Sequence, residues 1–188
     1  MKPTVGFALC GSFCTFRKTM EALRAIAEEY DVIPIFSETA ASTDTRFGKA
    51  ETFLCEAEKI CGRKPLCTIE EVEPFGPKKL LDLLIIAPCT GNTLGKLANG
   101  IADSAVTLAC KAHLRNGRPV VLAISTNDAL AANAENLGKL LHRKNYYFVP
   151  FGQDNPSEKP YSMVADFGLL SATLTQAFNG KQLQPMLL

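Results

Sequence analysis

The apolar residues of this chain fall into short continuous runs that alternate with stretches of helical periodicity. Continuous apolar runs of this length are typical of strands that are buried on both faces of a sheet. They predict strands over residues 5–9, 32–36, 83–87, 120–125 and 146–151. Apolar positions three and four residues apart predict helices over residues 15–30, about 53–60, 94–102, about 104–114, 129–141 and 164–178. The helix over 94–102 is expected to be interrupted at Asn99-Gly100 or to end at Asp103, and Asp103 or Ser104 is expected to cap the next one.

Strands that alternate with helices, without Asn-Gly hairpin signals between them, indicate a parallel sheet covered on both faces. The predicted fold class is α/β, a three-layer doubly wound sheet of the Rossmann-like or flavodoxin-like kind. Ligands of such sheets bind beyond the carboxyl ends of the strands. One site is therefore predicted where four loops meet, those that begin at Cys10, Ser37, Pro88 and Ser125. Residues 37–48 are expected to form a long irregular loop, and the polar segment 152–162 is long enough to favour a lid or a docking segment.

Composition and charge exclude several classes of protein. The 188 residues are 47% hydrophobic and 21% charged, as in an ordinary globular protein, and we expect a single domain over residues 1–188. Twenty basic and nineteen acidic residues leave a net charge of +1, so no nucleic-acid or anionic membrane partner is expected. The apolar runs are too short to cross a bilayer.

The seven cysteines are an odd number in a chain that shows no secretory signal. This usage predicts a cytoplasmic protein with reduced thiols. The closest cysteine spacings are C-x3-C and C-x5-C, and both histidines lie far from them, so no metal site is expected. Cys89 is interpreted as a buried core thiol, with a reactive thiol beside the site as the alternative.

The first loop, Cys10-Gly11-Ser12-Phe13-Cys14-Thr15, joins a predicted strand to a predicted helix, where backbone amides favour an anion such as phosphate. It differs from the dinucleotide motif G-x-G-x-x-G, because Phe13 and Phe16 occupy the second and third glycine positions. Glu38 still allows a nicotinamide cofactor as an alternative, since it could bind a ribose. The other alternative is that Gly11-Ser12 only turns the chain.

The segment 87–103, APCTGNTLGKLANGIAD, is the most specific motif of the chain. It resembles the cofactor-binding motif of the homo-oligomeric flavin-containing cysteine decarboxylase superfamily, in which a strand end, a proline and an Asn-Thr pair start a helix beside FMN. Segments 42–48 (STDTRFG), 124–130 (ISTNDAL) and 150–156 (PFGQDNP) narrow the resemblance to the family of dipicolinate synthase B subunits. The resemblance extends from Val5 to the Gln184-Pro185 tail.

The resemblance implies an FMN-type pocket in a homo-oligomeric protein. It further implies a partner, the dehydrogenase-like A subunit of dipicolinate synthase, on which NAD(P) is expected, and a small dicarboxylate substrate. The reaction would convert a dihydrodipicolinate-type intermediate of the lysine pathway to dipicolinate during sporulation. The flavin contacts carried over are Gly11, Ser12, Phe13, Ser37, Thr39, Thr90, Gly91, Asn92, Thr93 and Ser125.

The chain also departs from the flavin-dependent decarboxylases of that superfamily. They use a histidine between the second and third strands and a P-x-M-N-x-x-M segment, whereas this chain has no histidine before residue 113 and reads STNDAL over 125–130. Catalytic residues therefore stay unassigned. The alternatives are an FMN-dependent decarboxylase, and a non-catalytic subunit that positions substrate for a dehydrogenase partner.

Arg46 and Asn127 are the predicted substrate-binding residues. Arg46 lies in the irregular loop after the second strand, and its planar guanidinium suits a carboxylate. The alternative is that it pairs with Asp44 or another acid and only orders the loop. His113 is expected to be a solvated surface residue, and His142 to lie near a helix end, where a cation is favourable.

Overall fold

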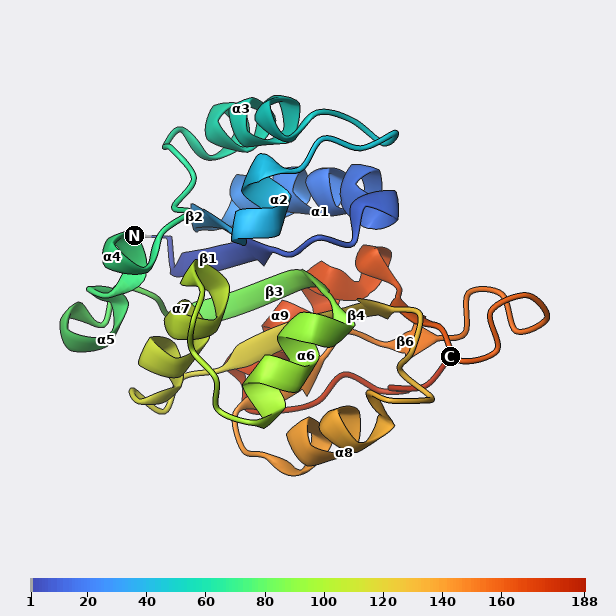
Figure 1. Ribbon diagram of the computed structural model, residues 1–188. Helices are drawn as coiled ribbons and strands as arrows, with labels where there is room; N and C mark the ends of the chain where they lie inside the picture. The colour runs from blue at the N-terminus through green and yellow to red at the C-terminus, as the bar shows by residue number, and fades with distance from the viewer. Residues whose placement is uncertain (1) are drawn as a thin grey trace.

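The computed structural model describes residues 2–188, in which a twisted sheet lies between two layers of helices (Figure 1). Five strands run parallel in the order β2, β1, β3, β4, β5. The order reverses between β1 and β3, the topological switch point at which flavodoxin-like sheets bind ligands. The five strands are β1 (Thr4–Leu9), β2 (Asp31–Phe36), β3 (Leu83–Cys89), β4 (Val120–Thr126) and β5 (Tyr146–Phe148).

The central strands are buried because both faces of the sheet are covered. All seven residues of β3 are buried, and its register with β4 places Leu84 opposite Val120 and Ile86 opposite Leu122. Strand β1 pairs with β2 over its whole length, from Thr4 opposite Asp31 to Leu9 opposite Phe36. Burial of aliphatic side chains from every central strand supplies the main driving force for this fold.

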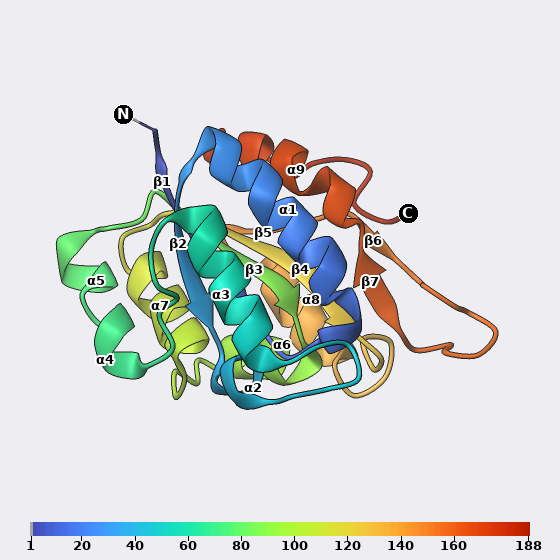
Figure 2. The same cartoon turned by 90° about the horizontal axis from the view of Figure 1, so that it is seen from above.

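Figures 1 and 2 show α1 (Phe16–Glu29) and α9 (Leu170–Phe178) on one face of the sheet, and α6 (Gly91–Ala98), α7 (Ala105–Leu114) and α8 (Ala134–His142) on the other. Helix α3 (Ala50–Cys61) packs on α1 beside the edge strand β2. Three short helices complete the chain, α2 (Glu38–Ser42), α4 (Ile69–Val72) and α5 (Phe75–Lys78). The α/β doubly wound prediction is confirmed.

Local signals fix several of the helix ends. The Ser104 side chain accepts a hydrogen bond from the Thr107 amide and caps α7 in a capping box. Helix α6 ends at Ala98, and Gly100 follows with φ at +73°, so Asn99-Gly100 is the interruption. Ile101, which continues the predicted stripe, is 47% exposed because the helix has already ended.

Several segments differ from the sequence prediction. The helix predicted from residue 129 begins only at Ala134, because the Ala131 and Asn133 amides donate to the Asp128 carbonyl and form turns instead. The irregular loop after β2 contains the short helix α2, which the Ser37 side chain caps. The predicted fifth strand is divided into β5 and β6 (Phe151–Gly152) at Pro150, which lacks an amide donor.

The helix predicted from residue 164 is wrong at its start. Residues Met163–Ala165 form strand β7, which runs antiparallel to β6 and to the end of β4. A short 3-10 turn, η2 (Phe167–Leu169), then leads into α9. The loop between β6 and β7 projects beyond the edge of the sheet, in orange in Figure 2. Within residues 2–188, no helix is both long and apolar enough to span a membrane.

Candidate functional site

A cavity of about 650 Å³ opens at the carboxyl ends of β1, β3 and β4. All four predicted loops reach it, the three that follow those strands and the far end of the 37–48 loop. Arg46 and Phe47 contribute a further wall, and the segment that contains β7 contributes another. The lining residues lie at positions 11–14, 46–47, 90–92 and 125–128, together with Asp154, Lys159, Ser162 and Val164.

The first loop presents hydrogen-bond donors to this cavity. The Ser12 hydroxyl lies 2.8 Å from the Ser125 hydroxyl, which joins the loops after β1 and β4. The Ser12 amide donates to the Cys10 carbonyl. In the part of the chain that the structure describes, the amides of Gly11, Phe13 and Cys14 have no acceptor. Several free amides at a strand-to-helix junction are a favourable environment for an anion.

The third loop is organised by two threonines that lie at the start of α6. Thr90 caps the helix by accepting from the Thr93 amide at 3.3 Å. Its hydroxyl donates to the Thr93 hydroxyl at 3.1 Å, and Thr93 in turn donates to the Cys10 sulfur at 3.2 Å. Thr93 is only 6% exposed, so its side chain faces the core rather than the cavity. The neighbouring Asn92 is exposed and lines the cavity.

Gly91 is required by a close approach between the third and fourth loops. A Cβ atom at this position would lie 2.6 Å from the side-chain amide nitrogen of Asn133 and 2.6 Å from the Thr126 hydroxyl. Both of these groups donate to the carboxylate of Asp128. Asp128 therefore holds the fourth loop together, a role that the sequence prediction missed because one of its partners, Asn133, comes from a turn that was predicted as helix.

The start of the second loop, at Ser37 and Thr39, lies outside the wall of the cavity. The Ser37 hydroxyl accepts from the Ala40 amide at 3.2 Å and caps α2. The Thr39 methyl carbon lies 3.1 Å from the position that a Cβ atom of Gly11 would occupy, so it supports the first loop. Neither residue lines the cavity. Flavin contact by Ser37 and Thr39 stays a prediction.

Arg46 lines the cavity and takes part in none of the ion pairs among residues 2–188. Asp44, its predicted alternative partner, instead accepts from the Ala50 amide at 2.9 Å, at the start of α3. The Arg46 guanidinium carbon lies 4.9 Å from the centre of the Phe47 ring. Phe47 is 46% exposed, so this pair forms an open cationic edge of the cavity. The other predicted substrate residue, Asn127, is exposed in the fourth loop.

The segment from Asp154 to Val164 contributes four lining residues that the sequence prediction did not include. Antiparallel pairing of Ser125 with Val164 brings this segment to the end of β4. The Lys159 amine lies 3.5 Å from the Asp154 carboxylate. A hydrogen bond from Ser162 is the main cause of the lowered pKa of Asp154, so this carboxyl is ionised at neutral pH.

The two histidines lie away from the cavity. The prediction that His113 is a surface residue is wrong, because it is 1% exposed and its Nε2 atom lies 3.0 Å from the Pro119 carbonyl oxygen. Burial lowers the pKa of His113 to about 4, which keeps the ring neutral. His142 is exposed in the last turn of α8, as predicted.

Cys89 is fully buried, and burial raises its pKa well above the usual value. A thiol in that environment is protonated and unreactive at neutral pH, which agrees with the interpretation of Cys89 as part of the core. Cys14 is different, since it is exposed and lines the cavity.

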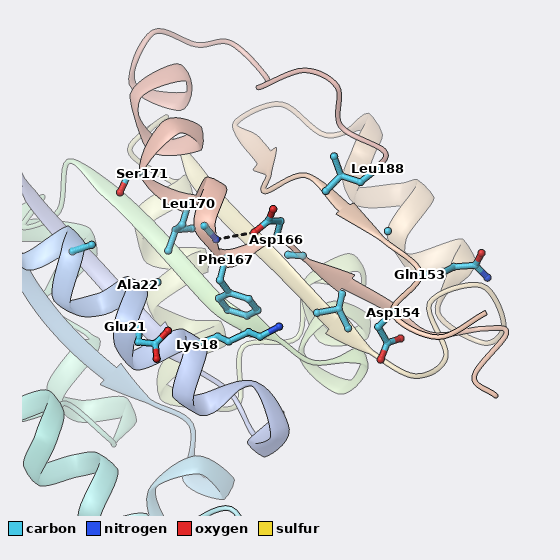
Figure 3. Close-up of a pocket in the computed structure, with 15 residues that line it drawn as sticks. Lys18, Glu21, Ala22, Gln153, Asp154, Asp166, Phe167, Leu170, Ser171 and Leu188 are labelled. Carbon is cyan, nitrogen blue, oxygen red and sulfur yellow. Dashed lines mark hydrogen bonds between the residues drawn. The ribbon is translucent and has the colours of Figure 1, made fainter. Parts of the chain in front are cut away.

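A larger cavity of about 880 Å³ lies beside the first, between α1 and the segment that runs from β6 to α9 (Figure 3). The two cavities share Asp154 and Val164. The charged residues that line the larger cavity include Lys18 and Glu21 from α1, and Asp166, whose carboxylate accepts from the Gly168 amide at 2.9 Å. The loops after β1 and β3 do not reach this cavity, so the smaller cavity is the candidate ligand site.

Comparison with known proteins gives a consistent result. The sequence profile described as Flavoprotein matches residues 1–174. The B subunit of dipicolinate synthase from Bacillus subtilis (strain 168) is 46% identical over 184 residues, which cover 97% of this chain and 92% of that protein. The crystal structure of the dipicolinate synthase B subunit from Bacillus halodurans C superposes with a TM-score of 0.91 at 43% identity, over 99% of this chain and 96% of that chain. The FMN-dependent cysteine decarboxylase SpaF shares the fold, with a TM-score of 0.65 at 23% identity over 93% of this chain and 97% of that chain.

Proposed function

The chain belongs to the Flavoprotein family and is a homologue of the B subunit of dipicolinate synthase, and we propose that it is the smaller subunit of a dipicolinate synthase, with FMN in the 650 Å³ cavity. The observation that carries the proposal is the convergence of three predicted flavin-contact loops on one cavity at the switch point of the sheet. Under this proposal the protein works in the cytoplasm during sporulation, as a homo-oligomer that joins a dehydrogenase-like A subunit.

The cavity has the groups that FMN requires. Its volume lies within the range of about 300–1,000 Å³ that is usual for small-molecule sites. The free amides and the Ser12 hydroxyl of the first loop suit the phosphate, and Phe13 lines the same wall with an aromatic ring. The amide side chains of Asn92 and Asn127 can bond to the polar edge of the flavin ring. Bound FMN would supply a two-electron acceptor.

The residues that line the cavity are suited to binding and orienting a ligand. Both histidines lie outside the cavity, and the Asp128 carboxylate is occupied by Thr126 and Asn133. Asp154 is ionised and pairs with Lys159. We therefore assign to this protein the binding of FMN and of a dihydrodipicolinate-type intermediate, with Arg46 and Asn127 on its carboxylates. The NAD(P) of the reaction belongs to the dehydrogenase-like partner.

The lack of an imidazole in the cavity also favours a second candidate function, a non-catalytic subunit that positions the substrate for its dehydrogenase partner. The same observation counts against a flavin-dependent decarboxylase, because proton transfer needs a group within hydrogen-bond reach of the substrate. Incubation of the flavin-loaded protein with a cysteinyl peptide should release no carbon dioxide above the buffer blank. Release of carbon dioxide above that blank would support the decarboxylase function instead.

Two measurements test the proposal. Calorimetry of the full chain with FMN, FAD and NADH should give the tightest binding for FMN, and tighter binding of NADH than of FMN would contradict the flavin site. The purified partner and the intermediate are then added anaerobically to the FMN-loaded protein. Loss of the flavin's visible absorbance supports a redox role, whereas dipicolinate formation with unchanged flavin supports the positioning role.

A further inference from the structure

The candidate site contains two cations that approach it from different loops. Arg46 comes from the segment before α3, and Lys159 from the loop between β6 and β7. They are the cationic side chains among the described residues that line the 650 Å³ cavity. Neither is firmly held by an acid, since Arg46 has no ion pair within residues 2–188 and the Lys159 amine lies 3.5 Å from Asp154.

The two carboxylates of the cavity have other partners. The Asp128 carboxylate accepts from the Thr126 hydroxyl and, at 2.8 Å, from the side-chain amide of Asn133. Asp154 lies 3.5 Å from the Lys159 amine, and its pKa is lowered chiefly by Ser162. Asp128 therefore keeps its donors within its own loop, and the cavity has two cations available for an anionic ligand.

The backbone at Lys159 is fixed, while its amine is free to move. The Lys159 amide donates to the Asn155 carbonyl at 2.7 Å, and its carbonyl accepts from the Ser162 amide at 3.0 Å. The Leu130 amide donates to the Tyr161 carbonyl at 3.0 Å, which ties this loop to the segment after β4. The Lys159 side chain is 57% exposed. An exposed ion pair of this length is weak, so exchange of its partner for a ligand carboxylate meets little resistance.

We propose that Lys159 is the second carboxylate-binding cation of the site, so that a dicarboxylate lies between Arg46 and Lys159 and displaces Asp154 from the lysine. The inference rests on the proposed function, because it names the residue that distinguishes a diacid from a monoacid at the same site. Arg46 binds one carboxylate through two parallel hydrogen bonds, and Lys159 binds the other as a mobile point charge. Asp154 competes with the ligand for the lysine.

The test measures dissociation constants for pyridine-2,6-dicarboxylate, pyridine-2-carboxylate and FMN on the full chain. Lys159→Met keeps the length of the side chain and removes the charge. We expect this substitution to weaken binding of the diacid about tenfold, the usual loss for one charge-assisted hydrogen bond. Binding of the monoacid and of FMN should change by less than about twofold, because Arg46 and the first loop are intact. Asp154→Asn should lower the dissociation constant of the diacid about two- to threefold, because it removes the charge that competes for Lys159.

Two further variants serve as controls. Lys159→Arg restores the charge and should keep diacid binding within about threefold of the parent. Lys144→Met removes an exposed lysine outside the cavity and should change none of the three constants.

Three outcomes would overturn the inference. Unchanged diacid binding in Lys159→Met, with clear binding to the parent, would remove Lys159 from the site and leave the proposed function intact. An equal loss of FMN binding would assign Lys159 to the flavin phosphate instead. A parent protein that binds FMN but not the diacid would reject both this inference and the dicarboxylate part of the proposed function.

Discussion

The hydroxyl oxygens of Ser12 and Ser125 lie 2.8 Å apart, although 113 residues separate them in the chain. Ser12 follows β1 and Ser125 lies within β4, with β3 between these two strands in the sheet. Their contact therefore closes one wall of the cavity over the end of β3. It also fixes the first loop, whose residues with free amides line the proposed flavin site.

This contact should appear as an energetic coupling between the two serines. Ser12→Ala and Ser125→Ala are each expected to lower the free energy of unfolding by about 1 kcal/mol, the usual net value of such a hydrogen bond. The double variant should lose little more than either single variant, because the second substitution removes a partner that is already alone. Urea unfolding of all four proteins measures the coupling. Strictly additive losses would show that the two hydroxyls act independently.

The close approach at Gly91 predicts that a larger residue there destabilises the protein. Gly91→Ala places a methyl group against Asn133 and Thr126, so we expect the free energy of unfolding to fall by about 1–3 kcal/mol and FMN affinity to fall with it. Gly138→Ala is the matched control, since it lies within α8 and a Cβ there meets no atom within 4 Å. It should stabilise the protein by about 0.5–1 kcal/mol. Equal effects of the two substitutions in thermal unfolding would contradict the packing around Gly91.

Arg46→Lys separates recognition from structure at the cationic edge of the cavity. Lysine keeps the charge and loses the two parallel hydrogen bonds, so dicarboxylate binding, or the activity of the two-subunit mixture, should fall about fivefold. FMN affinity and the melting temperature should stay near those of the parent, because no carboxylate of residues 2–188 pairs with Arg46. A clear drop in melting temperature with unchanged activity at low temperature would mean that Arg46 is structural.

His113 makes stability depend on pH. Its pKa is about 4 in the folded chain and 6.5 without the fold, chiefly because the ring is buried. Between these two values the unfolded chain binds a proton that the folded chain does not, so the free energy of unfolding falls as pH falls. The loss begins below pH 6.5, is complete near pH 4, and should reach on the order of 3 kcal/mol. Urea unfolding across this range should give a flatter dependence for His113→Gln than for the parent. Parallel curves for the two proteins would show that other groups cause the acid sensitivity.

The sequence by itself determined the elements whose signals are local. The continuous apolar run of β3 marks a strand that is buried on both faces. Ser104 marks a helix start through its capping side chain, and Gly100 marks a helix end through its left-handed backbone. The alternation of strands and helices indicates a parallel sheet, whose strands all end at one edge, so the meeting of the loops after β1, β3 and β4 was also predictable. Arg46 was found in the same way, from its place in a loop at a strand end.

The tertiary structure alone decided which side chains enter the cavity. Periodicity describes neighbours along one element, whereas β7 exists because Val164 pairs with Ser125. That pairing brings Asp154 and Lys159 to the site. His113 is buried against the Pro119 carbonyl, and Thr39 packs on Gly11 and does not line the cavity, because of contacts outside their own elements. Local spacing carries no information about such contacts, since they form only when several elements pack together.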